Sequence, residues 1–210
     1  MKINNLADNN SIFNHFIRDI RDINIQKDSM RFRRNLERIG ELFAYEISKK
    51  MEYSHYNIQT PLGIASQNLM KEEPVLATIL RAGIPLHQGL LNYFDKSENT
   101  FISAYRKYKV DGNFDIKIEY MSSPEINNRT IILCDPMLAS GSSMILAVEA
   151  LLSIGKPKHI HLVAAIASAQ GVEYVQKNTP FKDSTLWLGA IDDEMTKHSY
   201  IVPGLGDAGD

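Results

Sequence analysis

The sequence predicts an α/β fold, a mostly parallel sheet flanked by helices. Short, continuously apolar runs of strand length recur along the chain, at 75–80, 100–105, 131–134, 159–167 and 185–191. Segments with helical spacing of apolar residues follow several of them, at 84–94, 141–154 and 172–177. Strands that are apolar along their whole length are buried on both faces, which is typical of parallel strands lying between two layers of helices.

Two further segments extend this pattern. Before the first strand run, Asp28 or Ser29 can cap a helix, because apolar residues follow at steps of three and four: Phe32, Leu36, Ile39, Phe43 and Ile47. After Tyr105 there is no helix signal until the next strand; residues 115–120 alternate polar and apolar behind an Asp111-Gly112 turn. We therefore expect an N-terminal helical segment and a β-arm projecting around 107–128, which acts as a lid or an oligomer contact.

The composition limits the classes of partner. The chain has 210 residues, of which 44% are hydrophobic and 23% charged, as in ordinary globular proteins. Its length fits one domain, residues 1–210. The formal net charge of −2 provides no overall attraction to nucleic acid or to an anionic membrane, so we expect neither as a partner.

The cellular location follows from three weak signals. The single cysteine, Cys134, cannot form an internal disulfide, which fits a reducing compartment. The first ten residues are polar and lack the apolar stretch of a signal peptide. No apolar run approaches the ~20 residues that span a bilayer. We expect a cytoplasmic protein.

The stretch at 131–143, IILCDPMLASGSS, has the composition of an anion site. Asp135 stands at the carboxyl end of an apolar strand, and Pro136 stops that strand. Small residues from Ala139 to Ser143 then precede a helix, whose N-terminal amides attract a phosphate. The lysine of a nucleoside triphosphatase loop is missing, and no dinucleotide-binding G-x-G-x-x-G occurs. The residues alone leave open a plain strand-to-helix turn capped by serines.

Two arginines are predicted at the same edge of the sheet. Arg81 follows the 75–80 strand and Arg106 follows the 100–105 strand, so both stand at carboxyl ends, as Asp135 does. Guanidinium groups are always charged and bind phosphate oxygens in a forked geometry. His159 and His161 share a strand face, but no third ligand accompanies them, so no transition-metal site is expected. Cys134, inside an apolar strand, is read as inert core.

The sequence also resembles a known family in four segments. D-P-M-L-A-S-G-S-S at 135–143 is similar to the ribose-phosphate loop of uracil phosphoribosyltransferases, which are type I phosphoribosyltransferases. Y-I-V-P-G-L-G-D-A-G-D at 200–210 resembles the family's uracil-binding segment, and I-L-R-A-G and Y-R match its two arginine segments. One departure is Ser142, where the family usually has glycine; a positive φ there would strain serine.

The resemblance implies a set of site residues. Those for 5-phosphoribosyl 1-diphosphate are Arg81, Arg106, Asp135, Pro136, Met137, Leu138, Ala139, Ser140, Gly141, Ser142, Ser143 and Asp207. Those for uracil are Met137, Ala139, Tyr200, Ile201, Gly206, Asp207 and Ala208. The residues expected to take part in catalysis are Asp135, Asp207 and Arg106. Glycines near the base suit its acceptor–donor–acceptor edge, because backbone groups can approach closely.

The same resemblance implies the reaction and its partners. Uracil and 5-phosphoribosyl 1-diphosphate give uridine monophosphate and diphosphate, with Mg²⁺ held mainly by the diphosphate and not by protein ligands. Members form homodimers or larger homo-oligomers, and GTP activates some of them. Two alternatives stay open: a uridine-nucleotide-sensing RNA-binding regulator, against which the near-neutral charge argues, and a transferase for another base, against which the C-terminal segment argues.

Overall fold

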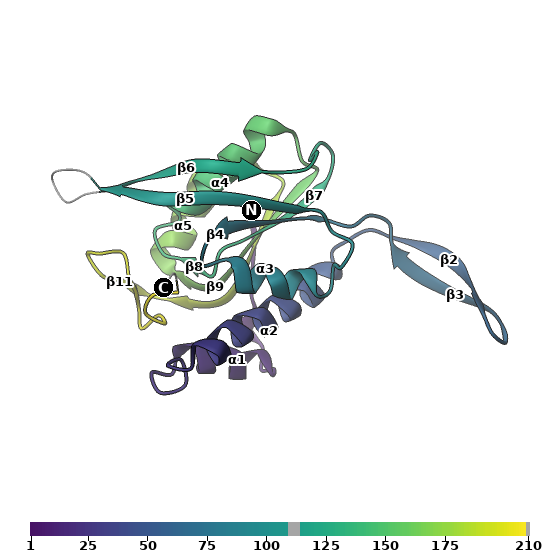
Figure 1. Ribbon diagram of the computed structural model, residues 1–210, viewed down its shortest axis with the longest axis horizontal. Helices are drawn as coiled ribbons and strands as arrows, with labels where there is room; N and C mark the ends of the chain where they lie inside the picture. The colour runs from purple at the N-terminus through teal and green to yellow at the C-terminus, as the bar shows by residue number, and fades with distance from the viewer. Residues whose placement is uncertain (109–113, 209–210) are drawn as a thin grey trace.

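The structure, a computed structural model, describes residues 1–108 and 114–208, with side chains described outside 105–117 (Figure 1). Its centre is an eight-stranded sheet in the order β1-β10-β9-β7-β4-β5-β6, with β8 paired to β9. The strands are β1 Lys2–Asn5, β4 Val75–Leu80, β5 Asn99–Tyr108, β6 Phe114–Ser122, β7 Thr130–Cys134, β8 Met137–Leu138, β9 His159–Ser168 and β10 Ser184–Asp192. All described pairs in this sheet are parallel except β5 with β6. The predicted mostly parallel sheet is confirmed.

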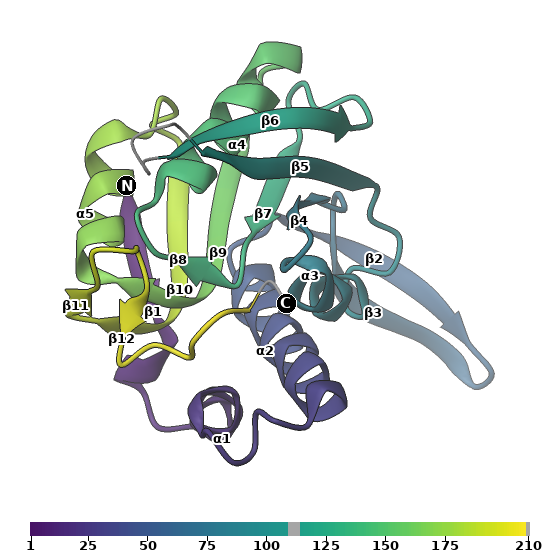
Figure 2. The same ribbon diagram turned by 60° about the vertical axis from the view of Figure 1, so that its left-hand side comes forward.

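Helices cover both faces of the sheet, as the apolar strands require (Figure 2). One apolar cluster lies between the sheet and the helices α1 Phe13–Arg21, α2 Ser29–Ser48 and α3 Ile84–Leu91. The other cluster lies between the opposite face and the helices α4 Ser142–Ile154 and α5 Ala169–Asn178. A short 3-10 helix, η1 at Leu6–Asp8, links β1 to α1. In the described part of the chain, no helix is both long and apolar enough to cross a membrane.

The predicted N-terminal helix begins where its capping signal indicates. Asp28 is the N-cap of α2, and its side chain accepts a hydrogen bond of 3.0 Å from the Arg31 amide. The apolar stripe of α2 is buried from Leu36 to Ile47, with Phe32 partly buried at its start. Phe43 packs edge-on against Phe13 of α1. Gly89 of α3 lies so close to the backbone of α2 that a Cβ atom would overlap Glu37. Helices α2 and α3 therefore form one tightly packed layer.

Two antiparallel strand pairs form arms at the periphery of the fold. The predicted arm is the antiparallel pair β5 and β6, whose connection at 109–113 lies outside the described residues. A second arm was not predicted: β2 Tyr53–Thr60 and β3 Gly63–Met70 form their own two-stranded sheet, which projects away from the helices (Figure 1). Its side chains are largely exposed, including the apolar Leu62 at the tip. Because neither face of this arm is packed, its sequence does not alternate regularly between polar and apolar residues.

Candidate active site at the carboxyl edge of the sheet

Three of the predicted site residues, Arg81, Arg106 and Asp135, lie on or directly after three adjacent strands of the sheet. Thr78 of β4 pairs with Cys134 of β7, so Asp135 and Arg81 both follow neighbouring central strands. The Asp135 amide donates a hydrogen bond of 3.0 Å to Val163 O on β9, which continues the ladder by one residue. Arg106 lies on β5, the strand on the other side of β4, and its backbone pairs with β6. The sheet therefore brings the three predicted positions to one edge.

The Asp-Pro turn differs from its prediction in one respect. Strand β7 ends at Cys134, as expected from the proline that follows. The chain does not leave the sheet there, because Pro136 O accepts a hydrogen bond of 3.0 Å from the Ile166 amide. Met137 and Leu138 then form β8, in parallel register with β9. This second pairing fixes the start of the predicted phosphate loop against the sheet.

The small residues of the loop have the backbone that an anion site needs. Gly141 is the N-cap of α4 with φ of 81°, and a Cβ there would lie 2.9 Å from Val175 Cγ2. Ser142 is the first residue of α4 and has no positive φ, so the strain expected at this serine is absent. The Ser142 amide lies 3.4 Å from Ser140 Oγ. The N-terminal amides and serine hydroxyls are thus gathered at one helix end, where a phosphate is favoured.

A residue that sequence reasoning missed holds this loop from below. Ser168, fully buried at the end of β9, donates a hydrogen bond of 2.6 Å from Oγ to Ala139 O and accepts one of 2.8 Å from the Gly171 amide. It therefore caps α5 and anchors the loop at once. Gly171 permits this approach, because a Cβ there would overlap the Ala139 carbonyl. A serine before a helix was readable as a cap, but its bond to a loop 29 residues away was not.

The predicted uracil segment packs beside the loop. Ile201 and Leu205 are buried in the apolar cluster beneath α1 and α2, and Ala208 packs against the same cluster. Met137 and Ala139, from the Asp-Pro loop, also pack against it. The two segments, about sixty residues apart by their numbering, thus meet on one face of the sheet, where the C-terminal chain runs past β8 (Figure 2). Gly209 and Asp210 lie outside the described residues.

The remaining members of this segment face outward. Tyr200 is 44% exposed, and Gly206 and Asp207 are exposed as well. Gly206 has φ of 87°, a backbone conformation that an L side chain rarely adopts. Exposed backbone amides next to a buried apolar floor are what a planar polar base requires, because its edge and its faces need different contacts.

An ion pair missed by sequence reasoning clamps this segment to the start of the chain. Arg21, the last residue of α1, binds both carboxylate oxygens of Asp192 at 2.8 Å each and donates to Gly204 O at 2.9 Å. Asp192 Oδ2 also accepts a hydrogen bond of 2.9 Å from the Gly204 amide. Asp192 is buried, so the forked pair satisfies both charges and fixes the turn at Gly204.

Two groups at this edge have strongly shifted pKa values. Burial raises the pKa of Asp135 to about 7, although a hydrogen bond from the Met137 backbone opposes the shift. Burial also raises the pKa of the Cys134 thiol to about 12. Cys134 is completely buried, in agreement with its reading as inert core. The charge of Asp135 therefore changes near neutral pH.

Comparisons with known proteins come from sequence and from structure. The model of the family "Uracil phosphoribosyltransferase" matches residues 7–210. The uracil phosphoribosyltransferase of Porphyromonas gingivalis is 55% identical over 210 residues, which cover 100% of this chain and 97% of that protein. The uracil phosphoribosyltransferase of Methanococcus vannielii is 39% identical over 197 residues, which cover 91% of this chain and 82% of that protein.

Solved structures extend the likeness to three dimensions. A protein from Aquifex aeolicus has a TM-score of 0.86 and 26% identity, covering 99% of this chain and 96% of its own. The adenine phosphoribosyl transferase from Trypanosoma brucei has a TM-score of 0.55 and 10% identity, covering 90% and 83%, and so shares the fold. The family match spans nearly the whole chain and includes both the predicted phosphate loop and the predicted uracil segment. The chain belongs to the uracil phosphoribosyltransferase family.

Proposed function

We propose that the carboxyl edge of the sheet is the active site at which this enzyme joins uracil to the ribose of 5-phosphoribosyl 1-diphosphate, giving uridine monophosphate and diphosphate. One observation carries the proposal: the phosphate loop and the uracil segment pack against the same apolar cluster, next to the strand end that bears Asp135. This packing supports a single pocket for both substrates, as a transfer between them requires.

Each part of the site has a distinct role in this proposal. The amides and serines of the loop at 139–143 bind the 5′-phosphate, and Asp135 accepts hydrogen bonds from the ribose hydroxyls. Arg81 and Arg106 stabilise the negative charge that gathers on the departing diphosphate. As the bond from ribose C1 to the diphosphate oxygen breaks, uracil N1 attacks C1 from the opposite face, and the N1 proton passes to the departing diphosphate. Positioning and electrostatics supply the catalysis, with no covalent intermediate.

Recognition of the base is assigned to the C-terminal segment. Backbone groups around Gly206 pair with the edge of uracil, and Asp207 orients the base or the ribose phosphate. The apolar faces of uracil lie against the remaining residues: Met137, Ala139, Tyr200, Ile201 and Ala208. Cytosine carries an amino group where uracil has O4, which would leave buried polar groups mismatched. This supports uracil over the alternative that the enzyme takes another base.

Magnesium fits this site as a partner of the substrate. Among the described residues, no group of three His, Cys, Asp or Glu side chains could hold a metal ion. Mg²⁺ prefers oxygen ligands and commonly takes them from substrate phosphates and water. We propose that diphosphate oxygens hold it, with no direct ligand from the chain. Bound there, it would neutralise part of the diphosphate charge.

Homo-oligomer formation is proposed through the β2–β3 arm. The arm projects from the core and exposes apolar side chains, including Leu62 at 99% and Ile64 at 72% (Figure 1). Exposed apolar groups on a projecting hairpin favour burial against a second copy. Activation by GTP, the cytoplasmic location and the absence of nucleic-acid binding stay predictions. In the predicted arm around 107–128, the side chains of 107–117 lie outside the described residues.

The test is a direct assay with matched variants. Protein, Mg²⁺, 5-phosphoribosyl 1-diphosphate and labelled uracil should yield labelled uridine monophosphate, and excess unlabelled cytosine, hypoxanthine or adenine should not compete. Arg106→Ala should mainly raise the KM for 5-phosphoribosyl 1-diphosphate, and Asp207→Asn should lower turnover. Lys177→Ala, on the far end of α5, is the control. An unchanged rate in Asp207→Asn would remove Asp207 from the site, and binding to pyrimidine-operon RNA without catalysis would favour the regulator.

A further inference from the structure

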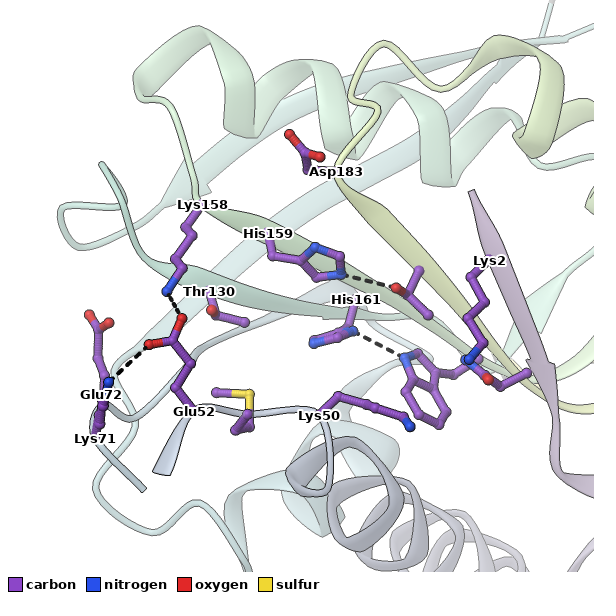
Figure 3. A pocket seen from close by; sticks show the side chains of 14 residues that line it. Lys2, Lys50, Glu52, Lys71, Glu72, Thr130, Lys158, His159, His161 and Asp183 are labelled. Atoms are coloured by element: carbon purple, nitrogen blue, oxygen red, sulfur yellow. Dashed lines mark hydrogen bonds and ion pairs between the residues drawn. The ribbon is translucent and has the colours of Figure 1, made fainter. Parts of the chain in front are cut away.

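A separate cavity of about 600 Å³ opens at the opposite edge of the sheet, where the parallel strands begin (Figure 3). Its walls come from the amino ends of β1, β7, β9 and β10 and from the turn that follows α2. The phosphate loop and the uracil segment stand at the carboxyl ends of the same strands. The cavity is therefore not part of the site described above, and nothing in the proposed reaction uses it.

The strand register explains why polar side chains gather there. Lys2 pairs with Thr185, which pairs with His161, so these three side chains share one face of neighbouring strands. Asn4 and Trp187 are paired in the same way, two residues further along. A parallel sheet normally has apolar residues on such a face. Here the residues at the start of β1, β9 and β10 are polar instead, on the face of the sheet that α2 covers.

The hydrogen bonds of this face leave donors directed at the cavity. Trp187 donates from Nε1 to His161 Nδ1 at 3.1 Å, and an indole nitrogen can only donate. His161 therefore carries its proton on Nε2, since burial and nearby His159 lower its pKa to about 3 and keep it neutral. Asn4 Nδ2 is buried and has no hydrogen-bond partner in the described part of the chain. An amide donor left unpaired in this way is costly unless a ligand or water accepts from it.

Apart from Asp183, the charged side chains that line the cavity fall into two groups. On one side Glu52 pairs with both Lys71 and Lys158, and Glu72 pairs with Arg129, so each lysine there already has a carboxylate partner (Figure 3). On the other side lie Lys2 and the ammonium end of Lys50, and neither forms an ion pair with any described residue. Two free ammonium groups next to unpaired N–H donors form a site for an anion with several acceptor oxygens.

We propose that this cavity binds a small phosphorylated organic molecule, with its phosphate at Lys2 and Lys50 and its uncharged part against the imidazole and indole rings. The volume supports an organic part, because a cavity of this size is typical of sites for whole small molecules. The two lysines paired with Glu52 then close the far end of the cavity, where their ion pairs leave them less available to the ligand. Acceptor oxygens of the ligand would satisfy His161 Nε2 and Asn4 Nδ2.

The chain contains its own reporter for this site. Trp187 is the only tryptophan and lines the cavity, so its fluorescence responds to occupancy there and not at the carboxyl edge. The probe is ribose 5-phosphate, titrated against the Asp135→Asn variant, because that change weakens the hydrogen bonds that the catalytic edge offers to the ribose hydroxyls. We expect a saturable fluorescence change. Inorganic phosphate, titrated in parallel, should bind more weakly because it lacks the uncharged part.

Variants assign the signal to the two lysines. Lys2→Ala and Lys50→Ala should each weaken binding about tenfold, the effect of one charge-assisted hydrogen bond. Lys50→Arg should retain binding, and Lys177→Ala, which removes an equal charge on α5, should change nothing. Both lysines are exposed, so their loss should leave the fold intact. No saturable change with ribose 5-phosphate, equal affinity for inorganic phosphate, or unaltered binding in both alanine variants would overturn the proposal.

Discussion

Replacing Asp135 by asparagine should remove a pH dependence of stability. Burial raises the pKa of this carboxyl to about 7, from an ordinary value of 3.8. Between about pH 4 and pH 7 the folded protein keeps a proton that the unfolded chain releases, so the stabilising contribution is complete below about pH 4 and is lost as the pH rises through 7. A difference of about three pKa units corresponds to roughly 4 kcal/mol. Asparagine has a similar shape and cannot ionise.

Urea unfolding of wild type and Asp135→Asn at about pH 4.5, 6 and 8 measures this effect. The free energy of unfolding of wild type should fall toward pH 8 relative to that of the variant, by at most roughly 4 kcal/mol. Glu149→Gln, which changes an exposed carboxylate on α4, is the control and should follow wild type. A constant difference between wild type and Asp135→Asn at every pH would refute the assigned burial of the charge.

The same shift makes a prediction for catalysis. In the proposed site the Asp135 carboxylate accepts hydrogen bonds from ribose hydroxyls, so only its ionised form is fully active. The kcat/KM for 5-phosphoribosyl 1-diphosphate should rise with an apparent pKa near 7, because this ratio reports the free enzyme. Asp135→Asn should lower it about tenfold to a hundredfold, the effect of losing bonds to a charged acceptor, and should flatten the pH profile. A profile unchanged in the variant would assign that pKa to another group.

Three further predictions concern residues around the site. Arg21→Lys keeps the charge but loses the forked pair with Asp192, so the KM for uracil should rise about tenfold while the KM for 5-phosphoribosyl 1-diphosphate changes little. Steady-state kinetics with each substrate varied in turn measures both values. An equal rise in both KM values would show that the ion pair does not act specifically on the uracil site. Ser168→Ala removes the N-cap of α5 and the hydrogen bond to Ala139 O, and should lower the free energy of unfolding by about 1–3 kcal/mol, measured by urea unfolding. Ser168→Thr, which retains the hydroxyl, is the control. Cys134, whose pKa burial raises to about 12, should resist iodoacetamide in the native state and react once urea unfolds the chain; modification of the native protein at the unfolded rate would contradict its burial.

The sheet was predictable because its central strands are buried on both faces. Such strands consist of apolar residues throughout, so β4 and β7 were identified almost to the residue. A parallel sheet then places every strand end on one edge, which is why Asp135 and Arg81 could be assigned to a common site from sequence alone. The start of α2 was predictable for a local reason, since the Asp28 cap acts on an amide three residues away.

The missed elements are those whose signal depends on distant contacts. Strand β8 has only two residues, and its existence depends on pairing with β9. The β2–β3 arm has no buried face, so its residues need not alternate. Ser168 and Arg21 act on carbonyls far along the chain, and no periodicity records such a partner.

The start of the chain shows why the support of a site is harder to predict than the site itself. No helix was predicted before Asp28, yet Phe13, Ile17 and Ile20 form the buried stripe of the nine-residue helix α1. That stripe places Arg21, at the helix end, against the last residue of β10 and the Gly204 turn. The uracil segment was recognisable because its own atoms are proposed to contact the ligand. Its rigidity comes from α1, and only the three-dimensional structure shows that the two ends of the chain meet.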